Sequence, residues 1–233
     1  MREISWRIFG LELAVLLPVA AVVMALFALL IYPALGLPRI APVPARTAVL
    51  VLVVWWLIKR RGEGWSDFGL RRPNSVWRIA LITVGLFLFK LFIVQPLSDL
   101  IRDLLALNAP DYSFFEHIHG NVPALLLWII MAWAIGGFAE EMLMRGYLMN
   151  RISLLLGGTA WAWTIAVVSQ AVLFGIAHAY VGLTGIVGAG LGALTFGGFY
   201  LLSGKNLWPV ILVHGLWDTL AITLVYLYGA PTT

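Results

Sequence analysis

The sequence predicts an all-α membrane protein, a polytopic bundle of about seven or eight transmembrane helices. First, 62% of its 233 residues are hydrophobic and only 11% are charged, whereas soluble domains carry roughly a quarter charged residues. Second, long apolar runs alternate with short polar loops. Third, a helix needs about 20 apolar residues to cross the hydrocarbon layer, and the chain has room for that many spans. We therefore expect a single integral-membrane domain over residues 1–233.

The expected helices follow from the apolar runs, taken in order. These runs cover about residues 8–35, 47–58, 79–98, 122–150, 159–180, 183–203 and 207–229. All but the second are long enough to span, and the second reaches that length if its helix extends back through Pro44. The first run is too long for the apolar part of a signal peptide, so we expect it to stay as a span. The sixth run is rich in glycine, which predicts close helix packing.

The loop charges predict the orientation of the bundle. Six of the fifteen Lys and Arg residues lie in the loop 59–78, interleaved with aromatic residues, as in a segment lying on anionic headgroups. By the positive-inside rule this loop and the N-terminus face the cytoplasm. The loop 99–121 then lies outside and is acidic, whereas Arg39 and Arg46 fall on the outer side against the trend. The net charge of +4 thus reports contact with the lipid bilayer, and we expect no nucleic acid partner.

Ionisable residues inside the spans are few, and such residues are costly in hydrocarbon and usually functional. Glu12 and Lys90 are isolated in the sequence, and we assign them no catalytic role. The others form three clusters on separate runs: Glu140-Glu141 with Arg145, Phe174 with His178, and His214 with Asp218. Cysteine is absent, which excludes disulfides, thiolate metal sites and cysteine nucleophiles.

The first cluster places two adjacent carboxylates in different roles. On a helix, Glu141 and Arg145 are four residues apart and can form an ion pair. Glu140 points about 100° away and stays without that partner. We therefore predict Glu141 with Arg145 as a positioning pair and Glu140 as a general base.

Counting residues along the helices tests whether the clusters can meet. Measured from the turn at 157–158, Glu140 and His178 lie within about 5 Å of the same depth. His214 reaches that depth only if the 204–207 turn sits at a different height or the helices tilt. Imidazole and carboxylate groups can bind a metal or activate water. Because the HExxH pair is absent, a metal would draw its ligands from separate helices: His178, His214 and either Glu140 or Glu141.

The motifs Glu140-Glu141-x-x-x-Arg145, Phe174-x-x-x-His178 and His214-x-x-x-Asp218, in this order, resemble those of a known family. They are similar to the CPBP intramembrane proteases, which include the type II CAAX prenyl endopeptidases and the bacteriocin-processing or immunity proteins called Abi proteins. The stretch GWSDFGLRRP before the third span also looks like that family. The resemblance covers about residues 60–225 as a protease core, with 1–59 as additional N-terminal spans.

The resemblance implies an endopeptidase that cleaves membrane-associated peptides, prenylated CAAX-type peptides among them, inside the membrane. Glu140 and His178 would activate the attacking water, and His214 with residue 218 would stabilise the oxyanion. Position 218 is Asn in the familiar prenyl endopeptidases and Asp here. Because an ionised Asp cannot donate a hydrogen bond, we expect Asp218 to orient His214 instead. The family is usually labelled metalloprotease, with Zn²⁺ as the alternative cofactor, but we prefer a glutamate-activated water that needs no metal.

Two other functions fit the same composition. One is an immunity or regulatory scaffold of the same fold without activity, which the intact Glu140, His178 and His214 argue against. The other is a proton-coupled transporter, because buried Glu, His and Asp residues also form proton relays. No inverted repeat or broken-helix pair is evident in the sequence, which disfavours the transporter.

Overall fold

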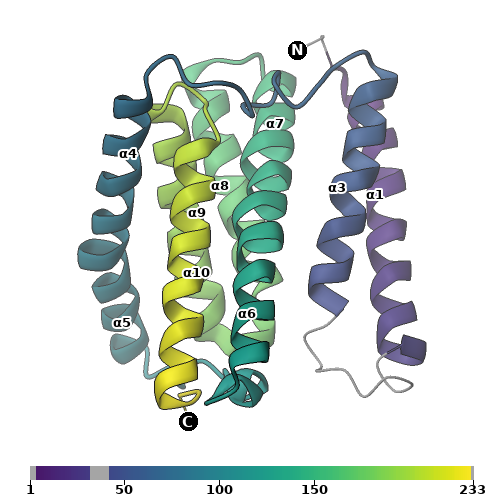
Figure 1. Ribbon diagram of the computed structural model, residues 1–233. Helices are drawn as coiled ribbons and strands as arrows, with labels where there is room; N and C mark the ends of the chain where they lie inside the picture. Colours follow the sequence, from purple (N-terminus) through teal and green to yellow (C-terminus); the bar gives the residue numbers. More distant parts are fainter. Residues whose placement is uncertain (1–3, 32–41, 232–233) are drawn as a thin grey trace.

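The computed structural model describes residues 4–31 and 42–231, which form helices and connecting loops with no strand among them. The predicted all-α fold is confirmed, and Figure 1 shows the helices standing side by side across a layer of common height. The α-helices are α1 (Trp6–Leu26), α3 (Pro42–Arg60), α4 (Val76–Phe89), α5 (Gln95–Leu104), α6 (Val122–Met131), α7 (Met149–Leu155), α8 (Ala160–Ala177), α9 (Gly182–Leu202) and α10 (Trp208–Tyr228).

Several of these helices join into longer spans through π-helical turns. Such turns at Lys90–Val94 join α4 to α5, and those at Ala132–Glu140 and Met142–Leu148 join α6 to α7. A π-helical turn also ends the first helix at Phe27–Ile31, and short 3₁₀ helices at Ser113–Ile118 and Ala179–Val181 precede α6 and α9.

Six helices of the described chain are long and apolar enough to cross a membrane: Trp6–Ile31, Val76–Leu104, Val122–Leu155, Ala160–Ala177, Ala179–Leu202 and Trp208–Tyr228. The second predicted run forms α3, which extends back through Pro44 as expected but is not among the six. This helix carries Arg46 near its start and Lys59 and Arg60 at its end. It packs against α1, and Figure 1 shows these two helices as a hairpin at one edge of the bundle.

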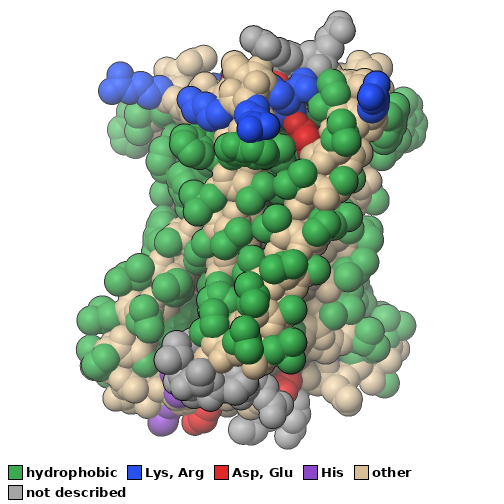
Figure 2. Space-filling model, turned by 90° about the vertical axis from the view of Figure 1, so that its right-hand side faces the viewer, with side chains coloured by type: hydrophobic (Ala, Val, Ile, Leu, Met, Phe, Trp, Pro, Cys, Tyr) green, Lys and Arg blue, Asp and Glu red, His purple; other side chains and the backbone are tan. Residues whose placement is uncertain are grey.

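The charged residues mark the two ends of the bundle. Figure 2 shows Lys and Arg side chains gathered at one end, with an apolar lateral surface below them. The segment 61–75 between α3 and α4 lies at this end, and α1 begins there too (Figure 1). The basic loop and the start of the first helix therefore lie at the same end of the bundle, as predicted. That this end faces the cytoplasm stays a prediction of the positive-inside rule. Arg39 lies outside the described residues.

Glycines allow the helix backbones to approach closely where the predicted clusters lie. The π-helical section after α6 crosses α10 at Gly137 and Gly215, where a Cβ on Gly137 would lie 3.1 Å from the Gly215 nitrogen. A Cβ on Gly215 would lie 2.6 Å from the ring of Trp133. Helices α8 and α9 meet in the same way, because a Cβ on Gly175 would lie 3.3 Å from the Cα atom of Gly190. The glycine-rich run therefore packs closely, as predicted.

At the basic end of the bundle, α10 begins below the level where α7 ends (Figure 1). Leu207 is fully buried, and its backbone N–H donates to the carbonyl of Gly69 at 3.0 Å. The side-chain amide of Asn206 donates to the carbonyl of Arg71 at 3.2 Å. The segment 61–75 thus covers the turn between α9 and α10, so α10 starts deep in the bundle. This is the difference in height that His214 needed to reach the depth of Glu140.

The two isolated ionisable residues of the spans have structural partners. The guanidinium of buried Arg151 lies 2.8 Å from Glu63 Oε2, and its NH2 group donates to Glu12 Oε1 at 3.3 Å. The hydroxyl of Tyr147 donates to the other Glu12 oxygen at 2.6 Å. This buried network ties α1 to α7 and to the basic loop. Lys90 places its ammonium 4.2 Å from the centre of the Trp217 ring, so its partner inside the bundle is aromatic.

Candidate active site

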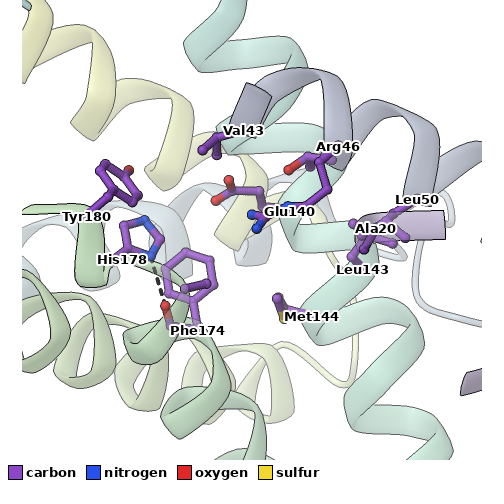
Figure 3. A pocket seen from close by; sticks show the side chains of 12 residues that line it. Ala20, Val43, Arg46, Leu50, Glu140, Leu143, Met144, Phe174, His178 and Tyr180 are labelled. Carbon is purple, nitrogen blue, oxygen red and sulfur yellow. Dashed lines mark hydrogen bonds between the residues drawn. The ribbon is translucent and has the colours of Figure 1, made fainter. Parts of the chain in front are cut away.

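A cavity of about 200 Å³ lies between the α1–α3 hairpin and the helices that carry the sequence motifs. Its walls are mostly apolar, with Glu140, His178, Arg46 and Tyr180 as the main polar side chains. Figure 3 shows Glu140 and Arg46 lying together and His178, Phe174 and Tyr180 on the other side. A mostly apolar cavity with a few convergent polar groups is the usual form of a ligand or active site.

The two adjacent glutamates occupy different environments. Glu141 is fully buried, and its Oε1 lies 2.8 Å from the NH1 atom of Arg145, whose side chain is 1% exposed. The guanidinium of Arg145 also lies 5.0 Å from the ring centre of Phe174. The side chain of Glu140 is 16% exposed and lines the cavity. The ion pair expected from the spacing is present, and Glu140 is the carboxylate that a ligand in the cavity could reach.

His214 lies at the centre of the buried charges. Its Nδ1 is 2.7 Å from Glu141 Oε1, and because the ion-paired Glu141 accepts, this nitrogen donates. Its Nε2 lies 3.9 Å from Glu140 Oε2 and 3.6 Å from Asp218 Oδ2, both too long for hydrogen bonds. Glu141 therefore holds the ring of His214, a role that the sequence interpretation gave to Asp218. Asp218 lies instead beside the free nitrogen.

His178 is held by its own helix turn. Its Nδ1 lies 2.8 Å from the backbone carbonyl of Phe174, and since a carbonyl only accepts, Nδ1 donates (Figure 3). In the neutral ring Nε2 is then the hydrogen-bond acceptor. The ring of Phe174 lies 4.5 Å from that of His178 and 6.2 Å from that of His214, so it separates the two imidazoles.

The structure brings the predicted residues together in two connected groups. Glu140 and Asp218 both lie within 4.0 Å of His214, while Glu140 also shares the cavity wall with His178. His214 and Asp218 do not line the cavity and lie directly behind Glu140. The backbone of Gly136 closes this side, because a Cβ there would lie 2.5 Å from Asp218 Oδ2.

Sequence reasoning missed three polar residues that line the cavity: Arg46, Thr47 and Tyr180. Arg46 comes from α3, and its signal in the sequence was its position on the wrong side for the positive-inside rule. Tyr180 follows His178 by two residues and carried no signal of its own.

The residues considered as metal ligands do not form a metal-binding group in the described part of the chain. There, no three His, Asp or Glu side chains are arranged to hold one ion. The Nδ1 atoms of His178 and His214 both donate hydrogen bonds to protein oxygens, so each ring offers only its Nε2 to a ligand. The arrangement of these residues in the described part of the chain therefore does not fit the zinc site that was considered as the alternative.

A comparison with protein families adds independent evidence. Residues 122–220 match the model of a family described as type II CAAX prenyl endopeptidase Rce1-like. This segment is thus similar to an Rce1-like domain. The match contains all three motifs and confirms the resemblance found in the sequence. The curated proteins and the solved structures give no significant match.

The matched segment covers α6 to the middle of α10, less than half of the chain. Together with the six long apolar helices, its similarity to a CAAX-type protease family supports an integral membrane protein. One wall of the cavity lies outside this segment, because Ala20, Val43, Arg46, Thr47 and Leu50 come from α1 and α3. The N-terminal hairpin is therefore part of the site.

Proposed function

We propose that this protein is an intramembrane endopeptidase that hydrolyses a peptide bond of a membrane-associated peptide with a water activated by Glu140 and His178. One observation carries the proposal: of the two adjacent glutamates, only Glu140 reaches the cavity, where the imidazole of His178 also lies. The similarity of residues 122–220 to an Rce1-like endopeptidase family supports a peptidase activity.

In the first step, Glu140 acts as general base. It removes a proton from water, and the water oxygen forms a bond to the carbonyl carbon of the peptide while the carbonyl electron pair moves to oxygen. The Nε2 of His178, left as an acceptor because its Nδ1 donates to the carbonyl of Phe174, accepts a hydrogen bond from the second O–H of the water, which keeps that hydrogen and is oriented by the contact.

The negative oxygen of the tetrahedral intermediate needs a hydrogen-bond donor. As an imidazolium, His214 offers its Nε2–H, and Glu141 fixes the direction of the ring. Asp218, when protonated, supplies a second donor beside that nitrogen. Collapse of the intermediate breaks the C–N bond, and Glu140 returns its proton to the departing amine. The products are an amine and a carboxylic acid, which then releases its proton to water, and no metal takes part in these steps.

The proposed substrate is a peptide held at the membrane, and prenylated CAAX-type peptides belong to this class. The mostly apolar walls of the cavity, with Leu50, Leu143, Met144 and Phe174, suit an apolar segment or lipid chain beside the scissile bond. The bilayer and this peptide are thus the proposed partners, and the basic end of the bundle is proposed to face the cytoplasm with the N-terminus.

The test is hydrolysis of an internally quenched, lipid-anchored peptide by the purified protein in liposomes. We expect Glu140→Gln to lower kcat at least about 100-fold, because general base catalysis typically contributes about 10²–10⁴-fold. The exposed carboxylate of Asp103 gives a matched control, and Asp103→Asn should leave kcat unchanged. Hydrolysis by Glu140→Gln at the wild-type rate would refute the mechanism, and activity lost to a chelator and restored by Zn²⁺ would refute its metal-free form.

A further inference from the structure

Arg46 is a cation that the proposed mechanism does not use. It lies near the start of α3, at the end of the bundle opposite the basic loop, and was an exception to the charge pattern of the sequence. The structure places it in the cavity wall, and Figure 3 shows its side chain beside that of Glu140. Its position is thus explained by the site rather than by membrane orientation.

The guanidinium of Arg46 has no hydrogen bond or ion pair with any residue between 4 and 31 or between 42 and 231. Two other cations near the site have interaction partners: Arg145 forms an ion pair with Glu141, and Lys90 lies over the ring of Trp217. A charge in an apolar cavity is costly unless an anion compensates it. Arg46 is half-buried, and within these residues Glu140 is not close enough to be its ion-pair partner.

We propose that Arg46 is a specificity-determining residue that binds the C-terminal carboxylate of the substrate. This inference rests on the proposed peptidase function and names the chemical group that the site reads. The planar guanidinium matches a carboxylate with two parallel hydrogen bonds. Because Arg46 and Glu140 line one cavity, the carboxylate would lie close to the scissile bond, on the side of the departing amine.

The charges of the cavity explain why such a residue is needed. Glu140, which must be ionised to act as general base, would repel an incoming carboxylate, and in an apolar setting this repulsion is strong. The cation of Arg46 on the facing hairpin offsets it. Acidic side chains are rare in membrane segments, whereas every peptide with an unmodified end carries a terminal carboxylate, so the terminal group is the expected ligand.

The experiment uses two lipid-anchored, internally quenched peptides that differ only at the C-terminus, one a free carboxylate and the other a carboxamide. We expect the wild type to cleave the carboxylate peptide with a kcat/KM about 10- to 100-fold higher, the usual range for a charge-assisted hydrogen-bonded pair. Arg46→Gln should remove this preference by lowering only the rate on the carboxylate peptide. Arg46→Lys should restore part of it.

Arg60→Gln is the matched control, because Arg60 lies at the other end of α3 with its guanidinium 4.0 Å from the ring centre of Trp56. It should keep the wild-type preference. Two results would overturn the inference: equal cleavage of both peptides by the wild type, or an equal loss on both peptides in Arg46→Gln, which would mean that Arg46 acts on Glu140 or on folding.

Failure of the proposed function would be recognised separately. It would show as no hydrolysis of either peptide by the wild type, or as full hydrolysis by Glu140→Gln. For that case the same two peptides are titrated onto Glu140→Gln and onto the double variant Glu140→Gln/Arg46→Gln. Tighter binding of the carboxylate peptide that disappears in the double variant supports the inference without turnover, and equal binding of both peptides to Glu140→Gln refutes it.

Discussion

Replacing Arg145 with alanine should destabilise the bundle far more than replacing the neighbouring Glu140. Arg145 and Glu141 are both buried, with NH1 and Oε1 2.8 Å apart. Arg145→Ala removes the ion-pair partner of Glu141 and leaves His214 as its only partner among residues 4–31 and 42–231, and breaking a buried pair in this way costs about 3–5 kcal/mol. In a domain of this size 1 kcal/mol corresponds to about 2–4 °C in Tm, so we expect a fall of roughly 6–20 °C.

The assay is thermal unfolding of the purified variants in one detergent, followed by hydrolysis of the quenched peptide. Glu141→Ala should lower Tm by a similar amount, since it leaves Arg145 with a single carbonyl, that of Ala193 at 3.4 Å. The double variant Glu141→Ala/Arg145→Ala should lose less than the sum of the two, because it leaves no unpaired charge. Glu140→Ala, the control, should unfold within a few degrees of wild type. A Tm for Arg145→Ala equal to that of Glu140→Ala would refute this reasoning.

Two further predictions concern the wall behind the cavity. Gly215→Ala should lower the free energy of unfolding by about 1–3 kcal/mol, because its Cβ would lie 2.6 Å from the Trp133 ring. The control Gly198→Ala has open space around its Cβ and should leave the free energy of unfolding unchanged or raise it. Equal Tm values for the two variants would contradict the packing argument. Asp218→Asn should keep kcat within about tenfold of wild type, since an amide can donate to the oxyanion and the ring of His214 is held from its other side. A loss as large as that of Glu140→Gln in the same hydrolysis assay would show that the carboxylate itself is required.

The helices and the three clusters could be predicted because both leave strong local signals. Apolar runs of about 20 residues mark spans wherever they occur, and with only 11% charged residues in the chain, an ionisable group inside a run is conspicuous. The pairing of Glu141 with Arg145 followed from helical spacing alone and survives the change to a π-helical backbone at Met142–Leu148. These features depend on residues a few positions apart.

What could not be predicted depends on contacts between distant segments. The partner of His214 Nδ1 is Glu141, 73 positions earlier in the chain, and no local pattern selects it over the nearby Asp218. The depth of α10 is set by the loop that covers Leu207, through the hydrogen bond that the Leu207 N–H donates to the carbonyl of Gly69. Arg46 joins the cavity only because α3 packs beside the π-helical section that carries Glu140.

Because α1 and α3 form one wall of the cavity, the two walls of the site are encoded in separate parts of the sequence. The residues proposed to cut lie between positions 140 and 218, inside the Rce1-like segment, whereas the opposite wall of the cavity is encoded in the first 60 residues. The network of Glu12, Tyr147 and Arg151 holds the two parts together. Substitutions in the hairpin can therefore change substrate preference while the hydrolytic residues stay the same. Without the hairpin, the segment 122–220 would lack the opposite wall of the cavity, and Glu140 would face lipid.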